Sequence, residues 1–172
     1  MRRREALILG AVGLGAAALG AVLAPVTLQR RRGEAALASA RFSDLAGNTR
    51  LLADWHAPAL VCNFWATWCE PCREEIPLLI GIRQKYGQNR VEVVGIGIDH
   101  ADKMQQFANQ YRIPYPLLSG QAGGPELMGE LGNDAGALPF TIVRDMKGAI
   151  RYRHLGRLRE GQLEPVLEGI LQ

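Results

Sequence analysis

The chain has 172 residues, 48% of them apolar and 22% charged, which fits one well-packed domain plus an extra segment and is too short for two ordinary domains. Its formal net charge is +3, but residues 1–40 carry six arginines and two glutamates, which leaves −1 for residues 41–172. The basic excess therefore belongs to the N-terminal segment, and the rest of the chain gives no reason to expect a nucleic-acid partner.

Residues 6–28 form an apolar run without a charge, flanked by arginines at positions 2–4 and 30–32. As a helix the run would be about 35 Å long, enough to cross a hydrocarbon core of about 30 Å. We expect residues 1–32 to be a retained anchor in the cytoplasmic membrane that places the remainder in the periplasm or another extracytoplasmic space. A cleaved export signal is the alternative, because paired arginines precede the run and Ala38-Ser39-Ala40 has the form of a cleavage site.

The small and polar residues 33–40 predict a linker, and residues 41–172 predict a single domain. The domain begins with two short strand patterns, 41–45 and 49–52, around a turn, which predicts a hairpin. Residues 59–66 are almost continuously apolar, as is typical of a central strand buried on both faces.

A helix is predicted for residues 71–86, where apolar residues follow the helical period and Gly87 ends the pattern. The later expected elements are a buried strand at 91–98, a helix at 101–111, a short strand at 115–119, a helical turn near 125–131, a hairpin of 140–144 and 149–154, and a C-terminal helix from about 163 to 171. This order predicts an α/β fold with a central mixed sheet and helices on both faces.

Cys69-Glu70-Pro71-Cys72 lies where the first central strand gives way to its helix. Two cysteines at this spacing can hold a metal, form a structural bridge or exchange disulfides. A structural zinc site needs four ligands, and three cysteines with three scattered histidines do not supply a second pair, so we expect no metal and no cofactor. A bridge over two residues constrains the unfolded chain little. Reversible thiol chemistry is the interpretation that uses both cysteines.

The position at a helix N-terminus has a chemical consequence for Cys69. Free backbone N–H groups and the helix dipole stabilise a thiolate there, so the pKa of Cys69 should lie below the ordinary thiol value of about 8.5. Cys72, one turn further and facing the interior, should stay protonated until it reacts.

Residues 64–72, FWATWCEPC, resemble the active-site signature of the thioredoxin superfamily, in particular its membrane-tethered, extracytoplasmic TlpA-like and ResA-like thiol-disulfide oxidoreductases. The resemblance extends from about Phe42 to the C-terminus and includes the stretches 91–99, 113–116 and 136–141, the last where the family places a cis-proline. It implies a thioredoxin-like fold in which Cys69 attacks a partner's disulfide and Cys72 then displaces the partner.

The resemblance also implies roles for neighbouring residues. Pro139 would be cis and Leu138 would pair through its main chain with an extended substrate segment. Trp68 would form the rim of the active site, and Pro71 between the cysteines would support it. These assignments make Leu138 and Pro139 the expected substrate-binding residues.

The base that takes a proton from Cys72 is left open by the sequence. In thioredoxins a buried aspartate occupies the place that matches Asn63, and asparagine cannot accept a proton. Glu70 is the nearest candidate, and as a negative charge beside Cys69 it should raise the thiol pKa and favour a reducing role. A solvated carboxylate that only complements the helix dipole is the equal alternative for Glu70.

The function expected is that of a monomeric, anchored disulfide reductase that serves exported proteins, in cytochrome c maturation or on copper-site precursors, and receives electrons from a membrane thiol protein. A disulfide oxidase or isomerase, and a copper-binding module without turnover, are the alternatives. Peroxide reduction does not fit, because Ala66 stands where such a site has threonine. A basic cluster is expected to be a solvated face of an edge strand, with an acidic docking surface as the alternative; it comprises Arg144, Lys147, Arg151, Arg153, Arg157 and Arg159.

Overall fold

The computed structural model describes residues 27–172. The chain divides into two compact units, Met1–Arg32 and Gly33–Gln172, and residues 27–32 of the first are helical. The apolar run predicted as an anchor lies outside the described residues, apart from its last two positions. Within residues 27–172 there is no helix with both the length and the apolar character needed to cross a membrane.

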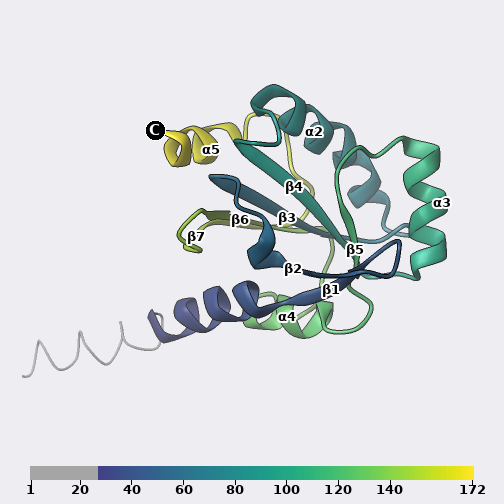
Figure 1. Cartoon of the computed structure of the whole chain (residues 1–172), viewed down its shortest axis with the longest axis horizontal. Coiled ribbons are helices and arrows are strands. Elements are labelled where there is room, and N and C mark those ends of the chain that lie inside the picture. Colours follow the sequence, from purple (N-terminus) through teal and green to yellow (C-terminus); the bar gives the residue numbers. More distant parts are fainter. Residues whose placement is uncertain (1–26) are drawn as a thin grey trace, which may run out of the picture. The chain divides into compact units, whose positions relative to one another are not determined.

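Within residues 27–172, seven strands form one mixed sheet in the order β2-β1-β5-β4-β3-β6-β7 (Figure 1). The strands are β1 Arg41–Asp44, β2 Thr49–Leu51, β3 Ala59–Trp65, β4 Val91–Gly97, β5 Leu117–Ser119, β6 Phe140–Asp145 and β7 Ile150–Leu155. β3, β4 and β5 are parallel to one another, and every other neighbouring pair in this sheet is antiparallel. The mixed sheet and the sequence of strands and helices predicted for the domain are confirmed.

Helices cover both faces of the sheet (Figure 1). They are α2 Glu70–Tyr86, α3 Ala101–Tyr111, α4 Gly124–Glu130 and α5 Glu164–Leu171, with a 3₁₀ turn, η1, at Leu52–Asp54. α2, α3 and α5 bury their apolar residues in one core, whereas α4 packs into a second core on the opposite face. β3 and β4 lie between the two cores and are buried along their whole length, which explains their continuous apolar sequences.

Residues 33–39, expected as a linker, are helical and packed into the second core. Leu37 is fully buried, and the carboxylate of Glu34 accepts a hydrogen bond from the Ile150 amide at 3.1 Å. A Cβ added to Gly33 would lie 2.8 Å from the Glu130 carbonyl oxygen, so only glycine fits there. The small residues that resemble a flexible connection instead serve close packing, and alanine is the best helix former.

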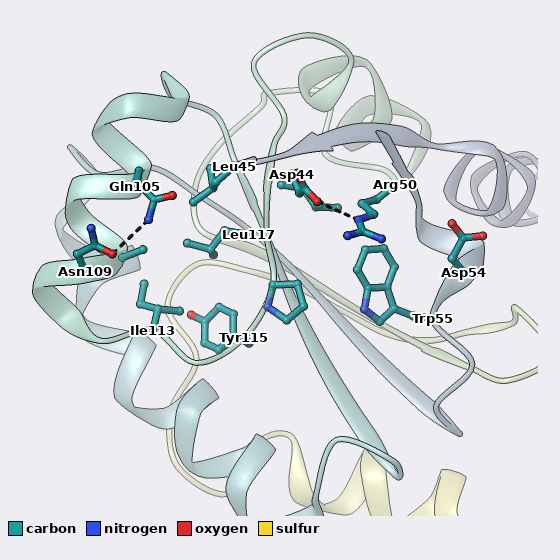
Figure 2. A pocket seen from close by; sticks show the side chains of 13 residues that line it. Asp44, Leu45, Arg50, Asp54, Trp55, Gln105, Asn109, Ile113, Tyr115 and Leu117 are labelled. Carbon is teal, nitrogen blue, oxygen red and sulfur yellow. Dashed lines mark hydrogen bonds and ion pairs between the residues drawn. The ribbon is translucent and has the colours of Figure 1, made fainter. Parts of the chain in front are cut away.

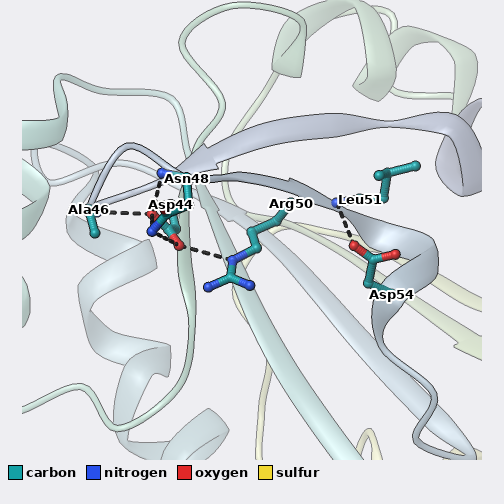
Figure 3. A network of polar contacts seen from close by, with 6 residues as sticks. All are labelled: Asp44, Ala46, Asn48, Arg50, Leu51 and Asp54. Carbon is teal, nitrogen blue, oxygen red and sulfur yellow. Dashed lines mark hydrogen bonds and ion pairs between the residues drawn. The ribbon is translucent and has the colours of Figure 1, made fainter.

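The carboxylate of Asp44 holds the turn between β1 and β2 (Figure 3). It accepts hydrogen bonds from the amides of Ala46 at 3.0 Å and Asn48 at 2.8 Å, and from Nε of Arg50 at 3.0 Å. A side chain that satisfies the turn's amides in this way is the usual mechanism by which aspartate starts a turn. The predicted hairpin at this position is confirmed.

A cavity of about 580 Å³ lies between this hairpin, α3 and the segment that leads into β5 (Figure 2). Leu45, Ile113 and Leu117 give it apolar walls, and the Asp44–Arg50 ion pair lies at its rim. Two of its other lining residues, Trp55 and Tyr115, precede β3 and β5, so the cavity lies towards the N-terminal ends of the parallel strands. The cysteines follow the C-terminal end of β3, and the cavity is therefore separate from them.

The basic cluster predicted from the sequence is exposed to solvent except at Arg144. Arg144 is buried on the inner strand β6 and donates to three backbone carbonyl oxygens, so the expectation of a solvated side chain is wrong for this residue. On the edge strand β7, the Nε of Arg151 pairs with Asp145 at 2.7 Å. Arg157, beyond β7, pairs with Glu74 of α2. The exposed arginines are thus divided between the edge strand and the segment that follows it.

Candidate active site

The two cysteines predicted to react lie at the N-terminus of α2. Cys69 is the N-cap residue, the helix begins at Glu70, and Pro71 occupies the first turn, where its missing N–H is not needed. A disulfide joins Cys69 and Cys72, whose Cα atoms are 5.3 Å apart. Cys69 is 6% exposed and Cys72 is completely buried. Both cysteines are therefore buried in the oxidised chain, and Cys69 retains slightly more solvent contact than Cys72.

Two tryptophans flank the strand-to-helix junction in different environments. Trp65 ends β3 and is 2% exposed, with its ring 5.3 Å from that of Phe107. Trp68 precedes the first cysteine and is 68% exposed. Trp65 is therefore a core residue, whereas Trp68 is a surface residue next to the first cysteine. Glu70 is exposed in the first turn of α2.

Asp99, beyond the C-terminal end of β4, holds the loop that precedes Cys69. One carboxylate oxygen accepts hydrogen bonds from the hydroxyl of Thr67 and, at 3.3 Å, from its amide; the other accepts from the His100 amide at 2.8 Å. Burial of Asp99 opposes its ionisation, but the hydrogen bonds from Thr67 and His100 outweigh that effect and lower the pKa of Asp99 below its ordinary value. An ionised carboxylate therefore fixes the loop that carries the first cysteine.

A buried carboxylate lies one helical turn beyond the second cysteine. Glu75 is 1% exposed; its Oε1 accepts from Nδ2 of Asn63 at 2.7 Å and its Oε2 accepts from the Leu158 amide at 2.7 Å. Nδ2 of Asn63 also lies 3.0 Å from the hydroxyl of Thr141. Cys72 and Glu75 are three residues apart in α2 and so project from the same side of the helix.

The environment of Glu75 makes this carboxyl group harder to ionise than an ordinary surface carboxylate. Burial raises the pKa of Glu75, and the hydrogen bonds from Leu158 and Asn63, together with the positive charge of Arg157, only partly offset this effect. A carboxyl group with a raised pKa can accept and return a proton near neutral pH more readily than an ordinary surface carboxylate. Sequence reasoning named Glu70 and missed Glu75. The signal was present: a glutamate at the i+3 position from Cys72, among the apolar residues that form the inner face of the helix.

The Leu138–Pro139 segment completes this end of the sheet. Its peptide bond is cis, as the family resemblance implies. Pro139 directly precedes β6, whose first residue, Phe140, is paired with Phe64 near the end of β3. The carbonyl oxygen of Pro139 accepts a hydrogen bond from the Gly156 amide at 2.8 Å. The proline segment, the end of β3 and the N-terminus of α2 therefore meet at one end of the fold.

In the part of the chain that the structure describes, the third cysteine is separate from the reacting pair, and the histidines do not form a metal site with it. Cys62 is free and completely buried in β3, and burial raises the pKa of its thiol to about 12. His100 is the N-cap residue of α3, and Nε2 of His154 lies 3.2 Å from the Arg157 carbonyl oxygen. Within residues 27–172, no group of three or more histidine, cysteine, aspartate or glutamate side chains is placed to hold a metal.

Comparisons with known proteins agree with this geometry. Residues 33–153 match the model of the AhpC/TSA family. Thiol-disulfide oxidoreductase ResA of Bacillus thuringiensis (strain Al Hakam) is 31% identical over 129 residues, which cover 74% of this chain and 72% of that protein. A thioredoxin-related protein from Neisseria meningitidis serogroup B is 30% identical with a TM-score of 0.65, covering 75% of this chain and 97% of the other. A DsbF homologue from Corynebacterium diphtheriae is 26% identical with a TM-score of 0.67, covering 77% and 85%. The fold is thioredoxin-like.

We predict that replacing Asp99 by asparagine destabilises the fold in a pH-dependent way. Because the folded-state pKa of Asp99 is lowered, its contribution is fully present above the unfolded-state value and is lost as pH falls through the folded-state value. The difference in unfolding free energy between the native chain and Asp99→Asn should be largest near pH 7 and should shrink below pH 4, as measured by urea denaturation. The exposed Asp134→Asn serves as the matched control. A difference that stays constant from pH 7 to pH 3 would contradict the charged hydrogen-bonding role.

Proposed function

This chain belongs to the AhpC/TSA family, and from that premise we propose that it is a thiol-disulfide oxidoreductase that reduces disulfides in exported proteins. Cys69 and Cys72 are its reactive pair. The observation that carries the proposal is their disulfide at the N-terminus of α2, with Cys72 completely buried one helical turn from the buried carboxyl group of Glu75.

The first step uses Cys69 in the reduced chain. Its thiolate, stabilised by the helix N-terminus, attacks one sulfur of a substrate disulfide. A new bond forms between Cys69 and that sulfur, the substrate's S–S bond breaks, and the second substrate sulfur leaves as a thiolate that takes up a proton. The product is a mixed disulfide between the chain and its substrate.

The second step uses Cys72 and Glu75. Glu75 accepts the proton of the buried Cys72 thiol, and the resulting thiolate attacks the sulfur of Cys69. The Cys69–Cys72 bond forms and the bond between Cys69 and the substrate sulfur breaks. That sulfur, the one attacked in the first step, leaves as a thiolate and takes up a proton. Two electrons have passed from the chain to the substrate. In this mechanism Asn63 orients the carboxylate of Glu75 by hydrogen bonding and is not itself the base.

The substrate segment is proposed to bind beside Leu138 and Pro139, next to Cys69. An extended peptide can form main-chain hydrogen bonds with Leu138. Pro139 has no N–H, so another strand of the chain cannot pair fully with the backbone at this residue, and the position stays open to a substrate segment. Trp68, exposed beside the cysteines, adds an apolar surface on which the substrate can pack.

The chain is proposed to act outside the cytoplasm, held at the membrane by residues 6–28. Its substrates would be disulfide-bonded exported proteins, such as cytochrome c precursors or copper-site precursors. A thiol protein of the membrane would return the Cys69–Cys72 disulfide to the dithiol, because an oxidising compartment offers no soluble reductant. This division of roles requires no cofactor in the chain itself.

The reducing direction is favoured by the charges around the cysteines. A strong oxidant stabilises its thiolate, and so its reduced form, whereas a negative charge beside a thiol opposes thiolate formation. Glu70 adjoins Cys69, so its carboxylate acts in the second sense. An oxidase would need the opposite electrostatic arrangement.

The first test is trapping of substrate. With the full chain in detergent, Cys72→Ala should accumulate mixed disulfides through Cys69, because the displacing thiol is missing. Non-reducing electrophoresis with an oxidised model substrate measures the adduct. The double variant that also carries Cys69→Ala should give none. Equal adduct formation in both variants would remove Cys69 from the nucleophile role.

A second test concerns direction. The equilibrium potential of the Cys69–Cys72 couple, measured against glutathione or a more reducing thiol buffer, should be about −230 mV or lower. Alkylation followed by mass spectrometry gives the reduced fraction at each buffer ratio. A value near −120 mV, as found for strong oxidants, would assign the chain to disulfide formation instead.

A third test separates Glu75 from Glu70. Glu75→Gln should slow resolution of the mixed disulfide by about 10²-fold near pH 7 and move its pH dependence towards an ordinary thiol pKa, because a general base typically contributes 10²–10⁴-fold. The Asn63 amide can turn over to accept from the new Gln amide, so the fold should survive, as circular dichroism can verify. If Glu70→Gln alone shifts the profile, the base is Glu70.

A further inference from the structure

We propose that the segment after β7 forms an anion-binding subsite beside Pro139, and that it selects substrates with an aspartate or glutamate side chain close to their disulfide. The inference rests on the proposed function, because it names a substrate class for the same active site. A cavity of about 610 Å³ defines the subsite, and its walls are His154, Leu155, Gly156, Arg157, Arg159 and Gln162.

The subsite adjoins the place where a substrate segment would lie. Leu155 pairs with Phe140, the residue after Pro139, and the Gly156 amide donates to the Pro139 carbonyl oxygen at 2.8 Å. Leu155 is 54% exposed and offers an apolar contact at the mouth of the cavity. In an extended peptide, residues two positions apart point to the same side and lie about 6–7 Å apart. A residue near the substrate cysteine can therefore reach this cavity.

The charged residues that line this cavity are arginines, although the same two arginines also line an adjoining cavity that contains Glu74, Glu160 and Glu164. Two arginines line the subsite and no carboxylate does. None of the ion pairs among residues 27–172 involves Arg159. Arg157 uses Nη1 to pair with Glu74, and both side chains are about half exposed, so this pair is weak and can be exchanged for another carboxylate. A guanidinium group binds a carboxylate through two parallel hydrogen bonds, which suits Asp or Glu.

The backbone that carries both arginines is held in place. Leu158, between them, is 2% exposed, and its amide donates to Glu75 at 2.7 Å. The amide of Arg159 donates to Oε1 of Gln162 at 2.6 Å. The carbonyl oxygen of Arg157 lies 3.2 Å from Nε2 of His154. The segment thus presents its cations from a fixed backbone, as a recognition site requires.

The test compares disulfide-containing peptides that differ at one side chain. Three peptides with one internal disulfide and blocked ends carry Glu, Gln or Lys two positions from the first cysteine. The reduced full chain in detergent should show a kcat/KM about three- to fivefold higher for the Glu peptide than for the Gln peptide, the range of a partly exposed charge pair, and lowest for the Lys peptide. Arg159→Gln should bring the Glu-to-Gln ratio towards one, and Arg159→Glu should make the Lys peptide the preferred substrate.

Lys147→Gln is the matched control, because it removes one positive charge from the β6–β7 turn, at the other end of the same hairpin. It should leave the Glu-to-Gln ratio unchanged. The ratio is read within each variant, so partial loss of active protein does not affect it. Equal rates for all three peptides, or an equal fall of the ratio in Lys147→Gln, would overturn the subsite and leave the proposed function standing. Failure to reduce any of the peptides would overturn the proposed function, and the subsite with it.

Discussion

A carboxyl group buried between a sheet and a helix constrains the surroundings of the two cysteines. Glu75 projects from α2 into a core from which water is excluded, and its oxygens must therefore find donors within the protein. β3 supplies one through Asn63, and the segment after β7 supplies another through the Leu158 amide. The hydrogen bonds of Glu75 thereby tie α2, one helical turn from Cys72, to the neighbouring strand β3 and to the distant segment after β7. Removing either donor would leave part of a buried acid without a partner.

The same requirement links proton transfer to substrate binding. Only one residue separates Gly156, which donates to the Pro139 carbonyl oxygen, from Leu158, which donates to Glu75. The Pro139 segment and the buried acid therefore share the short backbone segment 156–158 as a hydrogen-bonding partner. Arg157 lies between the two contacts and forms an ion pair with Glu74. Its positive charge also lowers the pKa of Glu75 and so partly offsets the effect of burial. A substrate carboxylate bound to Arg157 would partly neutralise this positive charge. The pKa of Glu75 would then rise, so the charge of the substrate can affect proton transfer by the buried acid.

Much of this arrangement follows from local sequence, and the exceptions have physical reasons. The strands buried on both faces, the N-terminal cysteines of α2 and the turn at Asp44 are set by periodicity and by turn or helix-end chemistry, which a single sequence displays. Residues 33–39 were misread because small residues serve linkers and close helix packing alike. Arg144 was misread because its carbonyl partners come from the distant Leu52 and Trp55, and pairing across that separation leaves no local trace. Glu75 was missed because a glutamate in a helix is usually solvated and its partner, the Leu158 amide, is 83 residues away.

The pKa values of two carboxyl groups near the reacting cysteines shift in opposite directions: that of Asp99 is lowered and that of Glu75 is raised. Asp99, with three donors, remains a charged and permanent anchor for the loop at Thr67, because hydrogen bonding outweighs burial there. Glu75, with burial dominant, has a raised pKa and ionises less readily than Asp99. A catalytic loop needs a group that does not titrate in the working range, whereas proton transfer needs one that does. The fold provides both by varying how many donors reach each carboxyl group and how deeply it is buried.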